Sequence, residues 1–358
     1  MRCNQSEPRF AVGDRVLFVN VTRQCNVDCD RCYLTLSHRM EKERLNPEVF
    51  RKLVSNPWFS EKPLTVIWEG GEAALIGKRS FTELAALCAE LLPSARQTMV
   101  TNLYAMPDWL IDLSRSHFSS HIETTLALRK KRGLGGSEAQ FLERFCASYK
   151  KVRAAGLSCP INIELNQETI QMGPGAMLDY LEQMGANQIE IDVSVEFSEF
   201  FKQPAYAVDG YPILPLSANY VEFSGYLKSM MTDHWERVCK LGIHSTLFDQ
   251  YKLGKRSTMF AVQRGHDFIT LNPDGTVTTN PLYSDFPNTY LGDLKTQEAG
   301  EVLFGGKRDR YLRHELRRTL PCLKCEYYSH CAGGPSHVPV QDGSGECVGM
   351  KSIWEQFS

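Results

Sequence analysis

The chain has no long hydrophobic run and no surplus of charge of either sign. Its longest apolar stretch, at 84–92, is short and is interrupted by Glu90, so we expect no transmembrane span. Residues 1–14 contain no apolar core of the signal-peptide kind. Both absences favour a cytoplasmic protein without a membrane partner. The 40 Lys and Arg residues nearly balance the 42 Asp and Glu residues, and the formal net charge of -2 disfavours a protein that wraps nucleic acid.

The sequence also lacks internal repeats and low-complexity tracts. Its 358 residues are 42% hydrophobic and 23% charged, which is the ordinary composition of a globular protein. This length predicts one large domain, or a large domain followed by a small one.

Apolar strand-like segments alternate with amphipathic helical segments over most of the chain. Strands are expected at 15–21, 64–68, 98–102, 121–128, 161–165 and 189–195. Helices are expected at 46–54, 81–92, 107–114, 138–155, 176–184 and 218–238. Such alternation predicts an α/β fold with a parallel sheet and right-handed crossovers, in which six units form a partial, open (β/α)6 TIM-like barrel. Its functional residues are expected to follow the carboxyl ends of the strands.

The pattern changes after about residue 240. Residues 268–278 predict a β-hairpin around an Asn-Pro-Asp-Gly turn. We therefore expect two domains, a barrel at 1–239 and a small metal-stapled domain at 240–358. Between them, 200–216 is rich in Pro, Tyr and Phe and is expected to cover the mouth of the barrel.

A basic helix is predicted at 307–318. We expect its charged face to be solvated and to carry internal ion pairs, such as Arg310 or Arg313 with Asp309 or Glu315. Contact with an acidic peptide or a phosphate is the alternative.

Twelve cysteines are many for a chain in a reducing compartment, where they are better candidates for metal ligands than for disulfides. Most of them fall into two groups: Cys25, Cys29 and Cys32, and then Cys322, Cys325, Cys331 and Cys347. The scattered remainder are expected to be small buried hydrophobic residues.

The first group, Cys25-x3-Cys29-x2-Cys32, directly follows the first predicted strand. Three thiolates on one loop can ligate a [4Fe–4S] cube and leave its fourth iron open to another ligand. A structural zinc ion is the alternative, but it usually takes four protein ligands, and the sequence nearby offers no fourth Cys or His.

The residues CNVDCDRCY around this group resemble the radical S-adenosylmethionine (SAM) superfamily, whose motif is C-x3-C-x2-C after the first barrel strand. A second motif of that family, Glu69-Gly70-Gly71-Glu72, stands directly after the second predicted strand. The resemblance implies that the three cysteines bind a [4Fe–4S] cluster and that the Glu-Gly-Gly-Glu loop contacts SAM, since glycines let backbone carbonyls approach an ammonium group. It also implies reductive cleavage of SAM to a 5′-deoxyadenosyl radical, which abstracts hydrogen from a substrate.

Further cofactor contacts are expected at Tyr33, Asn102, Thr125 and Asn166. Tyr33 follows the third cysteine, whereas Arg31 replaces the aromatic residue that many family members carry before it. Asn102 and Asn166 are equally compatible with turns. No catalytic acid or base is assigned, although some strand carboxylates are candidates if they point inward: Glu123, Glu164, Asp192 and Glu196.

The second group lies in the sequence CLKCEYYSHCAGG, which resembles the SPASM domain of radical SAM maturases. That domain normally has seven cysteines and two auxiliary [4Fe–4S] clusters. Three of the seven positions here hold other residues, Gln263, Asn280 and Pro335, and in the family these serve the first auxiliary cluster. The resemblance therefore implies a single auxiliary [4Fe–4S] cluster on Cys322, Cys325, Cys331 and Cys347, with electron transfer as the expected role and stapling of the domain as the alternative. By spacing alone, zinc fits these cysteines too.

Together these features predict a radical SAM oxidoreductase with a degenerate SPASM-like domain, of the peptide-maturase type. The expected substrate is a ribosomally made peptide that is crosslinked, epimerised or oxidised, and the expected reductant is a flavodoxin or ferredoxin. Because so few residues precede the first strand, a separate protein is expected to bind any leader peptide. The alternatives are a dehydrogenase or epimerase acting on a small carbohydrate or antibiotic precursor, and a non-catalytic iron–sulfur or zinc-binding redox protein.

Overall fold

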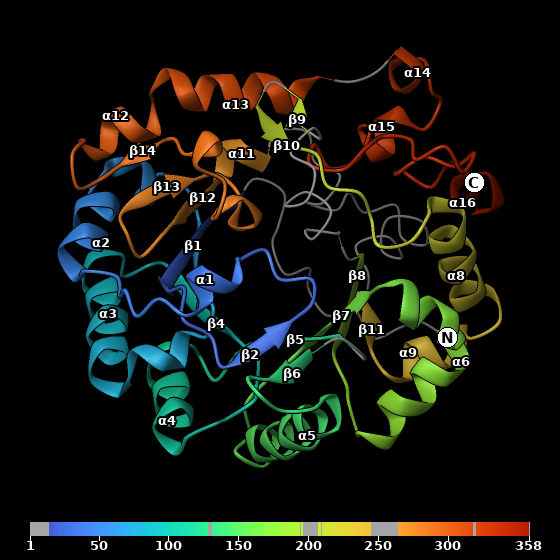
Figure 1. Ribbon diagram of the computed structural model, residues 1–358, viewed down its shortest axis with the longest axis horizontal. Helices are drawn as coiled ribbons and strands as arrows, with labels where there is room; N and C mark the ends of the chain where they lie inside the picture. Colours follow the sequence, from blue (N-terminus) through green and yellow to red (C-terminus); the bar gives the residue numbers. More distant parts are fainter. Residues whose placement is uncertain are drawn as a thin grey trace.

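The computed structural model describes residues 14–127, 131–193, 195, 207–208, 210–244, 264–317 and 320–357. Its centre is a large twisted sheet whose first strand, β1 (Arg15–Thr22), is buried at every position. A run of apolar and β-branched residues buried on both faces is typical of a central strand in a parallel sheet. Figure 1 shows this sheet with helices arranged around its outer side.

The sheet contains ten strands in the order β11-β8-β7-β5-β4-β3-β1-β12-β13-β14. All pairs from β11 to β12 are parallel. The remaining predicted strands are found as β3 (Leu64–Gly70), β4 (Arg96–Thr101), β5 (Glu123–Leu126), β7 (Ile161–Leu165) and β8 (Ile189–Val193). The short edge strand is β11 (Ile243–His244). Because the strand order runs open from β11 to β14, the predicted α/β class and partial barrel are confirmed.

The predicted helices lie between these strands, with some shifted bounds. They are α2 (Pro47–Val54), α3 (Lys78–Leu91), α4 (Asp108–His117), α5 (Glu138–Ala154), α6 (Gln167–Gln183), α8 (Tyr220–Thr232) and α9 (Trp235–Lys240). The helix predicted at 218–238 is thus two helices. The element α6 joins two helical segments across Gly173, whose φ of 78° and ψ of 156° are not helical. The segment from Pro174 onward corresponds to the helix predicted at 176–184, whereas the segment before Gly173, capped by Asn166, was not predicted.

The predicted hairpin is formed by β12 (Phe268–Leu271) and β13 (Thr276–Thr278), and β14 (Gly292–Asp293) adds a third antiparallel strand. Its turn uses Gly275 at a φ of 87°, in the left-handed region that favours glycine. Since β12 pairs in parallel with β1, the hairpin extends the barrel sheet.

Short elements complete the described chain. Near the cysteine loop and the hairpin these are β2 (Val27–Cys29), α1 (Leu36–Arg39), β6 (Lys131–Gly133), β9 (Ala207–Val208), β10 (Tyr211–Pro212), and 3-10 turns at Pro57–Ser60, Ala73–Ile76, Pro281–Tyr283 and Pro287–Thr289. The C-terminal helices are α11 (Arg264–Asp267), α12 (Ala299–Leu303), α13 (Gly306–Leu316), α14 (Leu320–Leu323), α15 (Tyr328–Cys331) and α16 (Lys351–Phe357). The segment predicted to cover the barrel mouth lies partly outside the described residues, and its described Tyr211 and Leu214 are buried.

The C-terminal segment is fastened to the barrel beside α8. The backbone N–H of Tyr220 donates to Asp342 Oδ2 at 2.7 Å, and the N–H of Leu214 donates to the carbonyl of His337 at 2.7 Å. Figure 1 accordingly shows α16 next to α8. Among all helices described, none has the length and apolar character needed to cross a membrane.

Candidate functional site

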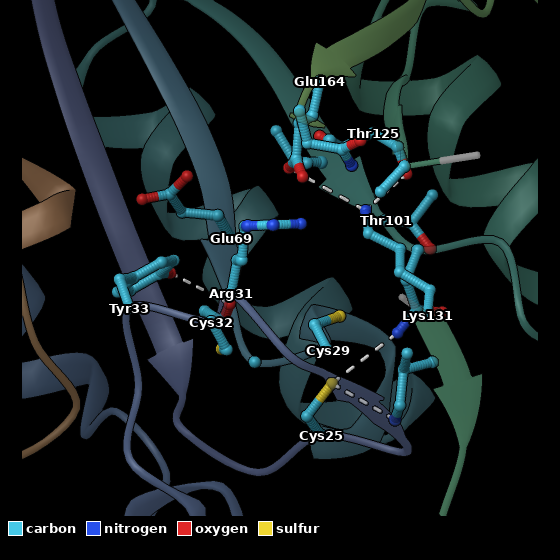
Figure 2. Close-up of a pocket in the computed structure, with 17 residues that line it drawn as sticks. Cys25, Cys29, Arg31, Cys32, Tyr33, Glu69, Thr101, Thr125, Lys131 and Glu164 are labelled. Carbon is cyan, nitrogen blue, oxygen red and sulfur yellow. Dashed lines mark hydrogen bonds and ion pairs between the residues drawn. The ribbon is translucent and has the colours of Figure 1, made fainter. Parts of the chain in front are cut away.

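The three cysteines that follow β1 line one pocket at the carboxyl ends of the central strands. Figure 2 shows their side chains gathered on one side, with Thr125 and Glu164 across from them. The space inside the pocket, counted together with its open mouth, is about 990 Å³.

The cysteine loop is held in shape by ion pairs. Its short strand β2 pairs with β6, so that Cys29 lies opposite Lys131. Asp28 receives Arg39 Nη1 at 3.0 Å on one oxygen and Arg132 Nη2 at 2.7 Å on the other. Arg132 also reaches Asp30 at 3.0 Å. Because Asp28 and Asp30 flank Cys29, these pairs hold the chain on both sides of it.

The downstream end of the loop is tied to the segment that follows the hairpin. The buried carboxylate of Asp285 accepts a hydrogen bond from the N–H of Thr35 at 2.6 Å and lies 2.7 Å from His38 Nδ1. Arg23, whose side chain is 3% exposed, lies 3.6 Å from Asp285 and 2.9 Å from Asp274 in the hairpin turn. The C-terminal half of the chain therefore helps to position the cysteine loop.

The thiols themselves are poorly stabilised as anions by the protein. Burial raises the pKa of Cys25 and of Cys32 to about 12, and it also raises the pKa of Cys29. Cys29 adds to the rise at Cys25 and at Cys32, and Cys25 adds to the rise at Cys32, because like charges repel. Three adjacent buried thiols are the donor set of a positively charged metal centre, whose charge would favour the thiolate forms.

Among the described residues, no three Cys, His, Asp or Glu side chains already converge on the position of a single metal ion. A cubane cluster does not require such convergence, because each of its thiolates binds a different iron. The three thiols therefore fit a cluster with one open iron.

The glycines after β3 pack directly against the cysteine loop. The N–H of Gly71 donates to the carbonyl of Thr22 at 2.9 Å, and the N–H of Glu72 donates to that of Gln24 at 2.8 Å. A Cβ atom at Gly70 would overlap the Thr22 carbonyl, and one at Gly71 would overlap the carbonyl of Gln24. No side chain fits at either position while the cysteine loop keeps its place.

Replacing Gly71 with alanine is therefore expected to displace the cysteine loop. Overpacking of this kind costs roughly 1–3 kcal/mol, so we expect SAM affinity to fall about tenfold or more and iron to be retained poorly. The matched control is Gly225→Ala on an exposed turn of α8, where the added methyl meets nothing within 4 Å. Equilibrium dialysis with SAM and iron analysis measure both effects, and wild-type affinity in the Gly71 variant would contradict the proposed packing.

Four predicted contacts from different strands and loops line the same pocket: Tyr33, Asn102, Thr125 and Asn166. The Tyr33 hydroxyl donates to the Gly70 carbonyl at 3.2 Å, and Asn102 Nδ2 lies 3.7 Å from Cys25 Sγ. Asn166 also caps α6, because its Oδ1 accepts a hydrogen bond from the N–H of Thr169 at 2.9 Å.

Glu69, Gly70 and Gly71 line the pocket, whereas Glu72 is not among its lining residues. The buried Glu72 carboxylate accepts from Thr101 Oγ1 at 3.0 Å and from the N–H of Asn102 at 2.8 Å. Burial raises the pKa of Glu72, and these hydrogen bonds oppose the rise. Glu72 thus joins the ends of β3 and β4.

Lys131, a buried cation in the pocket, was not among the residues predicted from the sequence. Lys131 Nζ donates to the Thr125 carbonyl at 2.9 Å and lies 3.9 Å from Glu164 Oε1. Its signal was the basic run directly after the strand at 121–128. Arg31, noted only as a departure from the family pattern, also lines the pocket and pairs with Glu168 at 3.2 Å.

Among the candidate strand carboxylates, Glu164 is in the pocket. Glu123 lies at the start of β5, away from the carboxyl end, and pairs with His121 at 3.7 Å. The side chain of Asp192 and the whole of Glu196 lie outside what the structure describes.

The four cysteines of the second group also share a pocket: Cys322, Cys325, Cys331 and Cys347. Burial raises the pKa of Cys331 to about 11, and the other three thiols contribute to the rise, which shows that all four are close. A Cβ at Gly349 would lie 2.9 Å from Cys331 Sγ and 3.9 Å from Cys347 Sγ. The glycine therefore leaves room between two of the sulfurs, and the all-thiol donor set fits an iron–sulfur cluster or a zinc ion.

The positions without cysteine have other roles or are not described. Asn280 caps the turn at Pro281–Tyr283, with its Oδ1 accepting from the N–H of Leu282 at 3.0 Å. Gln263 lies outside the described residues.

No protein-family model matches the chain, and no curated protein does so either. Solved structures do match. Native anSMEcpe with bound AdoMet and the Cp18Cys peptide is 17% identical, with 96% of this chain and 95% of that chain covered and a TM-score of 0.71. SuiB from Streptococcus suis, bound to its precursor peptide SuiA, is 14% identical. The match covers 92% of this chain and 75% of SuiB, with a TM-score of 0.62. Both are radical SAM enzymes.

The chain has the radical SAM fold. This likeness concerns the fold, whereas the grouping of the pocket residues named above rests on the geometry of this chain.

Proposed function

We propose that this chain is a radical SAM enzyme with one SAM-binding cluster and one auxiliary cluster. One observation carries the proposal. A single pocket is lined by residues that are far apart in the sequence, from 25 to 166. They are the three cysteines, the Glu-Gly-Gly segment and polar residues from the ends of β4, β5 and β7.

Cys25, Cys29 and Cys32 would hold the first [4Fe–4S] cluster, and Tyr33, Glu69, Gly70, Gly71, Asn102, Thr125 and Asn166 would surround SAM. When bound, the cluster and SAM supply a 5′-deoxyadenosyl radical that removes a hydrogen atom from the substrate. Glu72 would act indirectly, because its carboxylate accepts a hydrogen bond from the N–H of Asn102 and so holds Asn102 in place.

The chain also restricts water around the reacting groups. Val27, Val100 and Ala127 form the apolar part of the lining. Lys131 and Glu164, 3.9 Å apart, place one positive and one negative charge in the pocket lining, where they would hold polar groups of the cofactor or substrate. A mostly apolar pocket with a few fixed charges protects a radical and orients its partner.

A ribosomally made peptide is the proposed substrate, and a crosslink, an epimerisation or an oxidation is the proposed outcome. The support is that anSMEcpe and SuiB, which share the fold, are described with a bound peptide. We further propose a flavodoxin or ferredoxin as reductant, a separate leader-peptide-binding protein, and the cytoplasm as the location. The division into 1–239 and 240–358 is part of the same proposal.

The proposal is tested by anaerobic reconstitution, followed by addition of SAM and dithionite. We expect about eight irons per chain and formation of 5′-deoxyadenosine. The absence of both iron and SAM cleavage would overturn the enzyme proposal. Incubation with a peptide encoded beside this gene then tests the substrate: loss of two hydrogen atoms or an inverted centre supports peptide modification, whereas an unchanged peptide favours the small-molecule alternative.

A further inference from the structure

The helix α13 has one buried face and one strongly basic face. Arg308, Tyr311 and His314 are buried at helical spacing. Lys307, Arg310 and Arg313 recur every three residues on the exposed side. Figure 1 shows α13 along the outer edge of the molecule, leading toward α14.

The ion pairs predicted for this face do not form. The carboxylate of Glu315 is buried and accepts from the Tyr311 hydroxyl and from the N–H of Gly265, each at 2.8 Å. Within the described part of the chain, Arg310 and Arg313 form no ion pair. The exposed Asp309 forms no ion pair with either arginine, and Lys307, Arg310 and Arg313 outnumber it, so this side of the helix keeps a net positive charge.

An apolar strip continues the basic face toward the second cysteine group. Leu316 is 48% exposed, Leu320 69% and Leu323 54%. Leu320 and Leu323 are three residues apart in α14 and flank Cys322, which lines the four-cysteine pocket together with Lys324. Isolated exposed leucines are common, but here they adjoin uncompensated charge and a redox-capable site.

We propose that this surface docks a small acidic electron-carrier protein of the flavodoxin or ferredoxin class. The surface, termed the α13–α14 face, consists of Lys307, Arg310, Arg313, Leu316, Leu320, Leu323 and Lys324. The proposal rests on the proposed function, since the carrier would exchange electrons with the cluster held by the adjacent cysteines. One electron would pass from the carrier to a cluster held by these cysteines, and no proton or group would be transferred.

Charge and position favour an electron carrier over other partners. Electron-transfer complexes have small interfaces with charged rims, in which complementary charge speeds the encounter. The chain as a whole carries a formal charge of -2, so the basic surface is local. Cys322 lies within the proposed interface, and a docked carrier would be brought next to the ligand set.

The test compares two charge reversals in the reconstituted full-length enzyme, with an acidic flavodoxin as the probe. R310E/R313E alters the α13–α14 face, whereas K150E/R153E alters exposed cations of α5, which lies on the other side of the molecule in Figure 1. We expect R310E/R313E to weaken flavodoxin binding about tenfold or more at low ionic strength, and the control to bind like wild type. The difference should shrink at high salt, since screening is strong there.

Calorimetry measures binding, and SAM cleavage driven by dithionite measures the function separately. Both variants should keep dithionite-driven cleavage, and Leu320→Ser should weaken flavodoxin binding in high salt as well. The docking proposal would be overturned if the two charge variants bound flavodoxin equally well, whether or not both were weakened. It would also be overturned if wild type bound RNA or an acidic peptide but not flavodoxin. Failure of wild type to cleave SAM with dithionite would instead overturn the proposed function, while the binding comparison would still decide the docking surface.

Discussion

Cys29→Ala is expected to reduce SAM cleavage to background and to remove about half of the iron. Cys29 lies between Cys25 and Cys32, is held opposite Lys131 by the β2–β6 pairing, and lines the pocket with both other cysteines. Loss of one thiolate leaves two ligands for a cluster that already has one iron without a protein ligand.

The control for this prediction is a cysteine of the hydrophobic core. Cys159 is fully buried beside β7 and outside both cysteine pockets, and Cys159→Ala should keep iron and activity. We expect Cys159→Ala to lower only the free energy of unfolding, because a small cavity replaces the sulfur atom. Iron and sulfide analysis and the yield of 5′-deoxyadenosine provide the measurements. Unchanged cleavage in Cys29→Ala would mean that the first group does not hold the SAM-binding cluster.

The positions of the central strands could be predicted where a strand carries a mainly apolar, β-branched run, as β1 and β3 do. Ile161–Leu165 was predicted with its observed bounds, and the strand at 64–68 was placed within two residues. Helix bounds were harder. At α6 the helix predicted after the Gly173-Pro174 pair is present, but the helical segment before Gly173, capped by Asn166, was not predicted.

The pocket was predictable where residue type and position within a motif dictate chemistry. Cysteines after the first strand and glycines after the second are recognisable without coordinates. Lys131 was not, because its role follows from the pairing of β2 with β6, which places it opposite Cys29. Glu72 belongs to the motif, but its function in joining β3 to β4 depends on Thr101 and Asn102 from another strand.

The predicted ion pairs of the basic helix were wrong for a related reason. Sequence spacing places Glu315 near the arginines of its own helix, but burial of Tyr311 turns the Glu315 carboxylate inward to a hydroxyl and a backbone N–H. Spacing along a helix gives the possible pairs, and packing decides which of them form.

The double variant C322A/C325A is expected to lose the other half of the iron, from about eight to about four per chain. It removes two of four thiols that share one pocket, and it leaves Cys331 and Cys347 on either side of Gly349. Two ligands do not close a cube, and the remaining buried thiols would revert to the protonated form, because burial raises the pKa of Cys331 to about 11. Dithionite-driven SAM cleavage should persist, since the pocket of Cys25, Cys29 and Cys32 keeps all of its lining residues.

Metal analysis of this variant separates the possible contents of the site. Loss of one zinc with unchanged iron would assign zinc to the second group, and an unchanged content of both metals would contradict any metal there. Cys88→Ala, a fully buried core substitution, is the control for stability. If iron is lost and dithionite-driven cleavage persists, flavodoxin-driven cleavage decides the role of the cluster. Its loss would support electron transfer through the C-terminal site, whereas its persistence with a lower melting temperature would make the cluster a structural staple, because metal binding is coupled to folding.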